Sequence, residues 1–429
     1  MHRRPGLSRR RFLRGAAAAS AAAAAFTIVP AHVLGGPNRV PPSEQLTRGV
    51  IGTGGMGMGH VKSINTECRL LAVCDADARH LATALAQAGP GAKGYRDFRE
   101  LLDRPDIDII HIATPPHWHA TMAAMAADAG KDIWCEKPMS RTIAEGEKVV
   151  AAVNRNGRIF RLNTWFRFQD GFYGMRTPVK PIKKLALSGL LGWPLKATLG
   201  AHQGFAWKLD LWQGKPELKP EPIPRDLDYD LWLGPAPVKP YHPHRVHQSF
   251  RGYWDYDGGG LGDMGQHYLD PTQYVLGKDD DSPVDIEVET PAQHPDAVIP
   301  WKRLTMRYAD GCEIVMDGDD REKDAPYLEG PKGKLFPGFR SDIPNLEDKL
   351  AAFPDPEPQL TNFVQAVRTR RKFALNETNG HRSCTLVNLG LIAVRLGRNL
   401  KFDPKTQRFP NDPQANRLID QPMRGPWQV

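Results

Sequence analysis

The sequence has few cysteines, and their arrangement excludes two small-domain architectures. The 429 residues include five, namely Cys68, Cys74, Cys135, Cys312 and Cys384. An odd number without the paired spacing of zinc fingers favours neither a disulfide framework nor a structural zinc site. Three of them lie in or beside apolar segments of one expected domain. We therefore predict that they are thiols of the hydrophobic core.

The first 31 positions contain six arginines and no acidic residue, and they account for most of the net charge. The chain has 57 Lys and Arg against 49 Asp and Glu, a formal charge of +8. Without the basic leader, the chain is close to neutral and has no electrostatic footprint for nucleic acid, so we expect no nucleic-acid partner. The leader arginines are Arg3, Arg4, Arg9, Arg10, Arg11 and Arg14.

The leader also lacks an apolar run long enough to span a membrane. Its Ala-rich stretch, Gly15 to Val29, is short and weakly apolar, and it follows Ser8 to Arg14, in which paired arginines precede Phe-Leu. This resembles a twin-arginine signal, with a basic arm or a membrane anchor as alternatives. We predict a signal segment at 1–31, the twin-arginine export machinery as a partner, and a periplasmic or otherwise exported protein.

The remaining chain has the composition of a globular protein with two domains, at 41% hydrophobic and 25% charged residues. From Leu46, short apolar runs alternate with helical stretches, the pattern of a parallel sheet covered by helices on both faces. We predict an N-terminal doubly wound Rossmann domain at 46–162. The strands expected there are Arg48 to Ile51, Leu70 to Cys74, Ile107 to Ala113, Ile133 to Cys135 and Ile159 to Leu162, and the helices are Met56 to Asn65, Ala76 to Ala88, Asp97 to Asp103, Ala120 to Ala129 and Ile143 to Asn156.

The pattern changes after about Asn163, where we predict an α+β domain at 163–405 with a large open, mostly antiparallel sheet, then a tail at 406–429. Val284, Ile286 and Val288 alternate with acids, which indicates a strand with one buried face. The other predicted segments are strands at 195–202, 301–308 and 312–316, an ordered loop arm at 202–256 that shapes a pocket, a polar surface excursion at 317–357, and two late helices around 360–367 and 386–396.

A Gly-rich turn follows the first strand and fits the pattern G-x-G-x-x-G. Such a turn lets the backbone approach a pyrophosphate and directs the amides of the next helix at it. The second strand ends in a carboxylate suited to the adenosine ribose, which favours NAD over NADP, although Arg79 lies close enough to bind a phosphate. The residues predicted to bind the cofactor here are Gly52, Thr53, Gly54, Gly55, Met56, Gly57 and Asp75.

Two further segments follow strands at the carboxyl edge of the sheet, where doubly wound folds bind ligands. Thr114, Pro115, His117 and His119 follow one strand, and Glu136 with Lys137 follows the next. We expect them at the nicotinamide end of a dinucleotide. A solvated Glu-Lys ion pair, and loop histidines bonded to backbone carbonyls, are the alternatives.

Asp263 and His267 follow the glycines Gly258 to Gly260 and lie four residues apart, so a helix would place them on one face. Such a pair can bind a metal, can consist of a histidine oriented by a carboxylate, or can be an exposed ion pair. A metal site needs a third ligand, and the nearby His242, His244 and His247 lie in a Pro-broken stretch. We predict no metal.

These motifs together resemble the Gfo/Idh/MocA family of oxidoreductases over nearly all of the chain after the leader. The segment from Trp232 to Pro237 and the residues before the glycines resemble its exported bacterial branch. The resemblance implies that Lys137 is the catalytic lysine, that Asp263 and His267 complete the acid/base set, and that Glu136, His119 and Arg167 help to seat the cofactor. Pro116 and Trp165 depart from the family pattern beside the inferred nicotinamide site.

The resemblance implies an enzyme that moves a hydride between a nicotinamide and a hydroxyl carbon. A base must then take the hydroxyl proton, and Lys137 with His267 as relay and Asp263 holding its ring would serve. We expect a sugar or polyol substrate and a homo-oligomer through the C-terminal sheet. A redox-neutral glycosidase, lyase or epimerase is the alternative, since exported members with N-acetylgalactosaminidase activity exist. A non-catalytic sugar-binding protein is the third reading.

Overall fold

The structure is a computed structural model that describes residues 41, 44–63, 68–164, 166–168 and 177–427. The predictions for the leader at 1–31 and for Trp165 fall outside these residues. By its contacts the chain divides into one unit of residues 1–46 with 65–69 and another of residues 47–64 with 70–429. The predicted site lies wholly in the second unit, which is described below.

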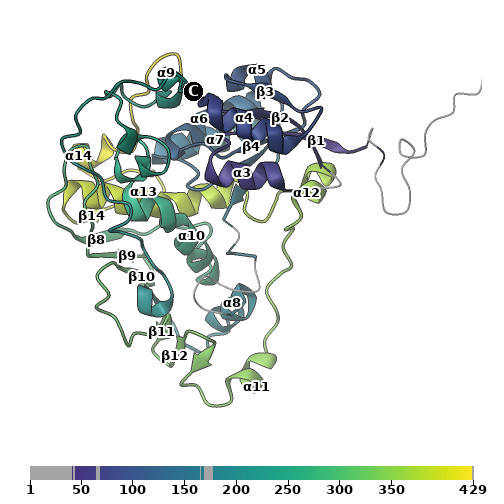
Figure 1. The fold of residues 1–429 in the computed structure, drawn as a ribbon. Coiled ribbons are helices and arrows are strands. Elements are labelled where there is room, and N and C mark those ends of the chain that lie inside the picture. Colours follow the sequence, from purple (N-terminus) through teal and green to yellow (C-terminus); the bar gives the residue numbers. More distant parts are fainter. Residues whose placement is uncertain (1–40, 42–43, 64–67, 165, 169–176, 428–429) are drawn as a thin grey trace, which may run out of the picture. The chain divides into compact units, whose positions relative to one another are not determined.

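The N-terminal sheet has six strands in the order β3-β2-β1-β4-β5-β6 (Figure 1). Strand β1 pairs with β4, β4 with β5, β5 with β6 and β2 with β3, all in parallel. This is the predicted doubly wound arrangement. Its elements are β1 (Leu46–Ile51), α3 (Gly55–Lys62), β2 (Cys68–Cys74), α4 (Ala78–Ala88), β3 (Lys93–Tyr95), α5 (Phe98–Leu102), β4 (Ile109–Ile112), η1 (Pro116–Trp118), α6 (His119–Asp128), β5 (Asp132–Glu136), α7 (Ile143–Arg155) and β6 (Phe160–Asn163).

Local sequence signals account for most of these boundaries. Helix α7 begins at a capping box, in which the Thr142 side chain accepts from the Glu145 amide and the Glu145 side chain reciprocates. Gly130 and Gly157, the predicted helix stops, follow α6 and α7 at φ 76° and 59°. In this sheet, only β3 was not predicted from the sequence. It lies at the sheet edge, and its residues Lys-Gly-Tyr form no apolar run.

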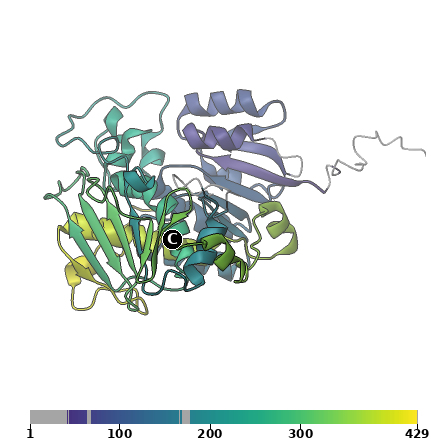
Figure 2. The same ribbon diagram turned by 90° about the horizontal axis from the view of Figure 1, so that it is seen from below.

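The C-terminal sheet has eight strands in the order β13-β12-β11-β7-β10-β9-β8-β14. Figure 2 shows strands of this sheet lying side by side. Its pairings are antiparallel apart from that of β7 with β10, as predicted. The elements are α8 (Val179–Leu187), β7 (Lys196–Leu199), η2 (Ala201–Gln203), α9 (Tyr229–Leu233), η3 (Pro243–Arg245), η4 (Ser249–Gly252), α10 (Gly259–Val275), β8 (Asp285–Glu289), β9 (Arg303–Arg307), β10 (Glu313–Asp317), β11 (Leu328–Gly330), β12 (Gly333–Phe336), β13 (Arg340–Ser341), α11 (Leu346–Ala351), α12 (Phe363–Thr369), α13 (Glu377–Leu396), β14 (Leu400–Lys401) and α14 (Pro413–Asn416).

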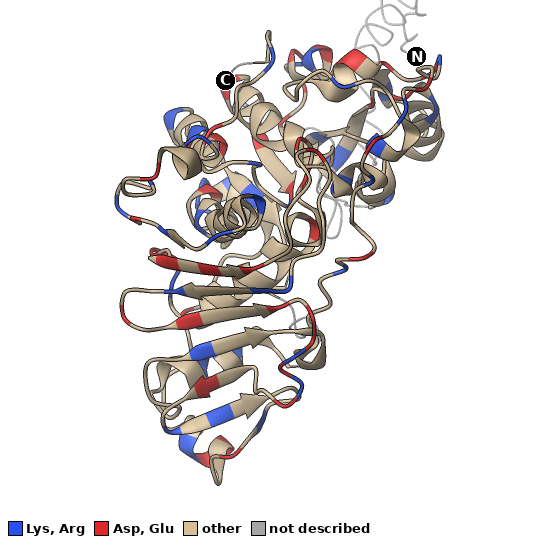
Figure 3. Cartoon of the chain, turned by 90° about the vertical axis from the view of Figure 1, so that its left-hand side faces the viewer, with Lys and Arg blue, Asp and Glu red and all other residues tan. Residues whose placement is uncertain are grey.

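The period-two pattern of the strands gives this sheet one apolar and one charged face. Ile286, Leu304 and Ile314 are fully buried in a core shared with residues of α8, α10 and α13. On the opposite face, Arg307 binds Glu287 of β8 and Glu313 of β10. Figure 3 shows basic and acidic residues interspersed along these strands. The helices therefore cover one face, and ion pairs cover the other.

One segment differs from its prediction. Residues 317–357, expected to be a surface excursion, include strands β11 to β13, which extend the sheet, and helix α11. Leu328 and Leu335 are fully buried and join the core. The apolar residues of this stretch are scattered among polar residues, Gly and Pro and give little periodicity, so tertiary packing and not local pattern sets these edge strands.

The arm at 202–256 is ordered, as predicted. It has little regular structure, but Trp232, Tyr253 and Tyr256 form a buried aromatic cluster with their neighbours. The five cysteines are all free and buried, which confirms that they are core thiols. Among the described residues, no helix has both the length and the hydropathy needed to cross a membrane.

Candidate active site

One cavity of about 1160 Å³ lies at the carboxyl edge of the six-stranded sheet. It combines residues of the Gly-rich turn, the two loops after β4 and β5, helix α10 and the arm. The structure therefore brings together segments that are more than 200 residues apart in the chain. The predicted site residues that line it are Gly52, Thr53, Gly54, Gly55, Met56, Asp75, Thr114, Pro115, Glu136, Lys137, Asp263 and His267.

The glycines of the turn have separate roles. Gly52 adopts φ +80°, and a Cβ there would lie 2.7 Å from the Thr114 amide nitrogen. A Cβ on Gly57 would lie 1.7 Å from the Gly52 carbonyl oxygen, so Gly57 does not line the cavity but lets α3 approach β1. Around Gly54 and Gly55 the space is open, with His80 at 4.0 Å from a Cβ on Gly54 as the nearest group. This open space beside the first amides of α3 fits a pyrophosphate.

Asp75 is held by the turn that it faces. Its Oδ2 accepts hydrogen bonds from the Thr53 amide at 2.7 Å and the Thr53 hydroxyl at 3.1 Å, and its Oδ1 accepts from the Asp77 amide at 2.9 Å. These bonds fix the carboxylate beside the turn, at the place where a ribose hydroxyl would accompany the pyrophosphate. The residues present therefore fit an adenine dinucleotide.

At the other end of the cavity, Lys137 and Asp263 form an ion pair. The Lys137 Nζ donates to the Asp263 carbonyl oxygen at 2.5 Å and to its carboxylate Oδ1 at 2.9 Å. Arg251 Nε also donates to Oδ1, at 3.0 Å, and Lys208 Nζ lies 3.9 Å from Oδ2. The carboxylate predicted to hold the His267 ring is thus bound by Lys137 and by Arg251. Of these two, only Arg251 was not predicted at this site.

Charge sets the protonation states of these groups. Burial alone would raise the pKa of Asp263, but the positive charges of Lys137 and Arg251 outweigh it and hold this pKa well below its usual value. Burial, with the charge of Lys137, lowers the pKa of His267 well below 6.5. At neutral pH the site therefore contains a carboxylate and a neutral imidazole. The imidazole, which contacts Phe166 edge-on, can accept a proton.

His117 and His119 do not line the cavity. His117 Nε2 lies 3.0 Å from the Trp232 carbonyl oxygen, and His119 lies between the carbonyl oxygens of Pro138 and Thr114, at 2.6 and 2.8 Å. Both rings are buried, and burial lowers their pKa values. Both contact backbone carbonyls, as the alternative to a cofactor role expects, and His119 joins the loops that follow β4 and β5.

Glu136 is supported by histidines that sequence reasoning missed. Its Oε1 accepts from Asn163 Nδ2 at 2.6 Å and lies 2.7 Å from His60 Nε2, while His60 Nδ1 lies 2.9 Å from His111 Nδ1. His60 is on α3 and His111 on β4, and nothing local in the sequence marks them. This network fixes the Glu136 side chain at the wall of the cavity.

The arm closes the cavity on the Asp75 side. Asp77 forms an antiparallel bridge with Leu227 of the arm. The Ala78 amide donates to the Asp226 carbonyl at 2.9 Å, and the Asp228 amide donates to the Ala76 carbonyl at 3.0 Å. Further along the arm, residues 246–251 line the cavity, as do Lys208 and Trp212. The arm is therefore part of the site, in agreement with the prediction that it shapes a pocket.

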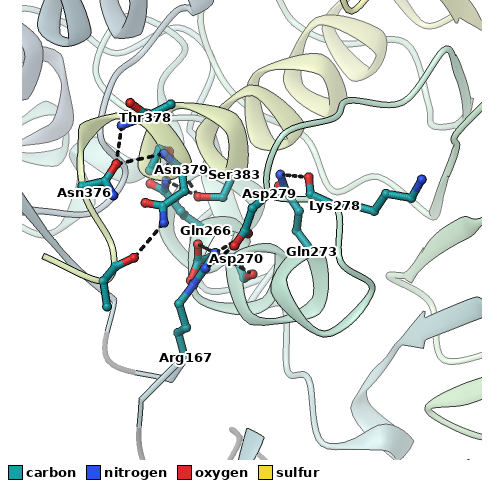
Figure 4. Close-up of polar contacts among 12 residues, drawn as sticks. Arg167, Gln266, Asp270, Gln273, Lys278, Asp279, Asn376, Thr378, Asn379 and Ser383 are labelled. Carbon is teal, nitrogen blue, oxygen red and sulfur yellow. Dashed lines mark hydrogen bonds and ion pairs between the residues drawn. The ribbon is translucent and has the colours of Figure 1, made fainter. Parts of the chain in front are cut away.

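Arg167, predicted to help seat the cofactor, lies elsewhere. Its guanidinium is fully buried and binds both carboxylate oxygens of Asp270, at 2.9 and 2.7 Å, and both of Asp279, at 2.7 and 2.8 Å (Figure 4). The two carboxylates hold the pKa of Arg167 above its usual value against the effect of burial. Because its donors bind acids of and beyond α10, Arg167 acts here as a structural brace.

Asp263 and His267 do not belong to a cluster suited to a metal in the described part of the chain. Such a cluster comprises Asp77, His80 and His247, whose ligand atoms lie within 4.8 Å of one another. The Asp77 carboxylate already accepts from the Arg79 amide at 2.8 Å and from its guanidinium at 2.9 Å. Arg79 thus competes directly with any metal there.

Two domain models of one oxidoreductase family match the chain. Residues 46–164 match its NAD-binding Rossmann fold, and residues 175–429 match its C-terminal alpha/beta domain. The chain belongs to the Gfo/Idh/MocA oxidoreductase family. This membership confirms the predicted family, its Rossmann fold and NAD as the cofactor.

Curated relatives of this Gfo/Idh/MocA chain include enzymes of several activities. An inositol 2-dehydrogenase from Salmonella typhimurium is 30% identical over 154 residues, 35% of this chain and 44% of the relative. A levoglucosan dehydrogenase from Pseudarthrobacter phenanthrenivorans is 28% identical over 304 residues, which are 68% of this chain and 62% of the relative. A glycosyl hydrolase family 109 protein 2 from Shewanella sp. strain MR-4 is 39% identical over 116 residues, 25% of each chain. This chain thus spans less than two thirds of the length of these relatives.

Solved structures share the fold. A WlbA dehydrogenase from Bordetella pertussis, in complex with NADH and UDP-GlcNAcA, superposes with a TM-score of 0.58 at 17% identity, covering 84% of this chain and 99% of its own. An aldose-aldose oxidoreductase from Caulobacter crescentus, complexed with glycerol, superposes with a TM-score of 0.55 at 21% identity, covering 83% of this chain and 100% of its own.

The roles of the glycines can be separated by two substitutions on one helix. Gly57→Ala places a methyl group against the Gly52 carbonyl, so it should displace α3, lower the melting temperature and reduce the bound nucleotide. Gly59→Ala meets nothing within 4 Å and should keep the nucleotide and gain up to about 1 kcal/mol. Thermal unfolding and nucleotide released by denaturation measure both. Equal behaviour of the two variants would contradict the close approach of α3 to β1.

If Arg167 is a structural brace, its substitution should lower the stability of the fold and should not remove contacts with the cofactor. Arg167→Met leaves Asp270 buried without its cation, so the free energy of unfolding should fall by about 3–5 kcal/mol in a denaturant titration. The double variant Arg167→Met/Asp270→Asn should recover part of this loss, because the fully buried carboxylate is removed and the Asp279 carboxylate that remains is 26% exposed. A fully stable Arg167→Met protein that has lost its nucleotide would restore the predicted cofactor role.

Proposed function

We propose that this protein is an exported NAD-dependent oxidoreductase that transfers a hydride between a tightly held nicotinamide and a hydroxyl carbon of a sugar, polyol or glycoside. The observation that carries the proposal is the Lys137–Asp263 pair with its 2.9 Å contact, beside His267 in the cavity that contains the Gly-rich turn. The named activities of the inositol and levoglucosan dehydrogenases agree with this substrate class.

The chemistry divides between cofactor and protein. A bound nicotinamide supplies the hydride acceptor, and the protein must remove the hydroxyl proton and stabilise the charge that develops on oxygen. Lys137 places an ammonium donor at the cavity wall, fixed by its two bonds to Asp263. The Lys137 ammonium would stabilise the charge that develops on the oxygen, and the His267 imidazole, neutral because burial lowers its pKa, would accept the hydroxyl proton. Asp263 keeps Lys137 in place, so it acts through the lysine.

A redox-neutral glycosidase is the second candidate. The similarity to a glycosyl hydrolase family 109 protein favours it. In that reaction the hydride is returned to the substrate, so no net change in nicotinamide absorbance would accompany product formation. Following absorbance and product together during a screen of sugars and glycosides separates this candidate from a net dehydrogenase. A sugar-binding protein without activity would give neither signal.

The arm supports tight retention of the nucleotide. Its backbone bonds to Ala76 and Ala78 lie beside Asp75, so dissociation of the adenosine end would require the arm to open. Retention also agrees with the twin-arginine proposal for 1–31. That pathway exports folded proteins, and no nicotinamide pool exists outside the cell for exchange. We further propose that copies associate through the C-terminal sheet, whose ion-paired outer face predicts a salt-dependent mass in solution.

Lys137→Met should lower turnover by at least about a hundredfold, the usual scale for a positioned acid or base. The fold and the bound nucleotide should persist because Arg251 still pairs with Asp263. Initial rates on the best substrate, the melting temperature and the nucleotide content are the measurements. Lys215→Met, on the exposed arm, serves as the control for losing a lysine. Near-normal turnover of Lys137→Met would refute the role of Lys137.

Purified protein should contain close to one NAD per chain after dialysis without added cofactor. Retention over hours requires slow dissociation and a dissociation constant of about nanomolar or below. Cell fractionation of the full chain should locate it outside the cytoplasm. Purified protein without nucleotide that regains activity only with added NAD would refute retention. Export would be refuted if the wild-type chain is found in the cytoplasm and the Arg10→Lys/Arg11→Lys variant has the same location.

A further inference from the structure

Asp257 is a buried carboxyl that the proposed mechanism does not use. It precedes the glycines at the start of α10, is 1% exposed and lines the same cavity as Lys137 and His267. Its Oδ1 is fully buried and lacks a hydrogen-bond partner within the described residues. Since buried side-chain oxygens are nearly always hydrogen-bonded, a carboxyl with an unpartnered oxygen at the wall of this cavity calls for an explanation.

The neighbouring cations are directed at other acceptors. Arg141, which precedes α7, donates to the carbonyl oxygens of Asp257 and Trp254 and so fixes the backbone of this segment. Arg251 of η4 and Lys137 after β5 both bind Asp263 on α10. No ion pair with the Asp257 carboxyl occurs in the described ranges. Among the acids, Asp263 has the largest electrostatic effect on Asp257, and its charge opposes ionisation of this second carboxyl.

This environment favours the neutral acid. Burial, together with the charge of Asp263, raises the pKa of Asp257 to about 7, against the opposing charges of Arg251, Arg141 and Lys137. A large fraction of the protein therefore has a carboxylic acid here at neutral pH. A protonated carboxyl is a hydrogen-bond donor, whereas a carboxylate can only accept.

The helix start leaves room for this side chain. A Cβ on Gly262 would lie 2.0 Å from the Asp257 Oδ1, so the glycine is what allows the carboxyl to occupy its position against the first turn of α10. Oδ1 thus packs against α10, so a partner in the cavity that Asp257 lines would meet the other carboxyl oxygen, Oδ2.

We propose that Asp257 is a substrate-contacting residue whose protonated carboxyl donates a hydrogen bond to an oxygen of the sugar or polyol. The inference rests on the proposed function, because it places the substrate beside Lys137 and Asp263. The bond would be made by the neutral acid alone. Substrate binding should therefore weaken as the proton is lost, whereas binding of the nucleotide should not depend on it.

Steady-state kinetics of the holoenzyme with levoglucosan and myo-inositol, and calorimetric binding of glycerol, test this. For wild type, KM or Kd should rise about tenfold between about pH 6 and about pH 8, because only the protonated fraction binds. Asp257→Asn keeps a donor and does not titrate, so its constants should stay flat. Asp257→Ala should weaken binding about tenfold or more at all pH values, with the same nucleotide content. Asp255→Asn, which lies outside the cavity, is the matched control.

Infrared difference spectra give a readout that needs neither turnover nor a stable variant. A protonated-carboxyl band should titrate near pH 7 in wild type, be missing in Asp257→Asn and shift when glycerol is added. The proposal is overturned if that band is absent, if glycerol leaves it unshifted, or if Asp257→Ala binds as wild type does. If the Lys137→Met variant is inactive but the Asp257→Ala variant binds substrate as wild type does, only this inference is rejected. If the Lys137→Met variant is active, the proposed function is rejected.

Discussion

The ion pair between Lys137 and Asp263 is the interaction on which the site depends, since it joins the two halves of the fold. Lys137 follows a strand of the parallel sheet, and Asp263 lies on the buried helix α10. Both side chains are almost fully removed from water, at 11% and 7% exposure. Burial of one charge alone would be costly, but Arg251 contributes a second donor and offsets part of the desolvation. The pair fixes a charged donor at the point where the reacting hydroxyl would lie.

Close approach is the second constraint, and small residues make it possible. Helix α3 can direct its amides into the cavity because Gly57 has no side chain to meet the Gly52 carbonyl. At the start of α10, Gly262 leaves space for the Asp257 carboxyl in the same way. Glycine at these two positions therefore sets how closely the start of each helix approaches its neighbouring atoms. The charged groups can then approach one another to hydrogen-bonding distance.

Local patterns in the sequence predicted the parts of this structure that local physics determines. The Gly-rich turn, the strands of the parallel sheet and the carboxylate of Asp75 follow from spacing and periodicity. The roles of Arg167 and His119 did not follow, because their partners are fixed by packing: Asp270 lies 103 residues from Arg167, and the two carbonyls that contact His119 lie on separate loops. His60 under Glu136 is a similar case, since 76 residues separate them.

The bridge between Asp77 and Leu227 has a consequence for how such a protein can diversify. Its hydrogen bonds join main-chain atoms, so they do not depend on which side chains the arm presents. Residues 246–251, further along the same arm, face the cavity and belong to neither sheet. Val246 and Phe250 belong to the buried cluster of the arm and Arg251 binds Asp263, so the side chains that can change without altering packing are those of Gln248 and Ser249. The attachment of the arm and the chemical character of the binding surface are thus physically separable, and a new ligand preference could arise there at little cost to folding.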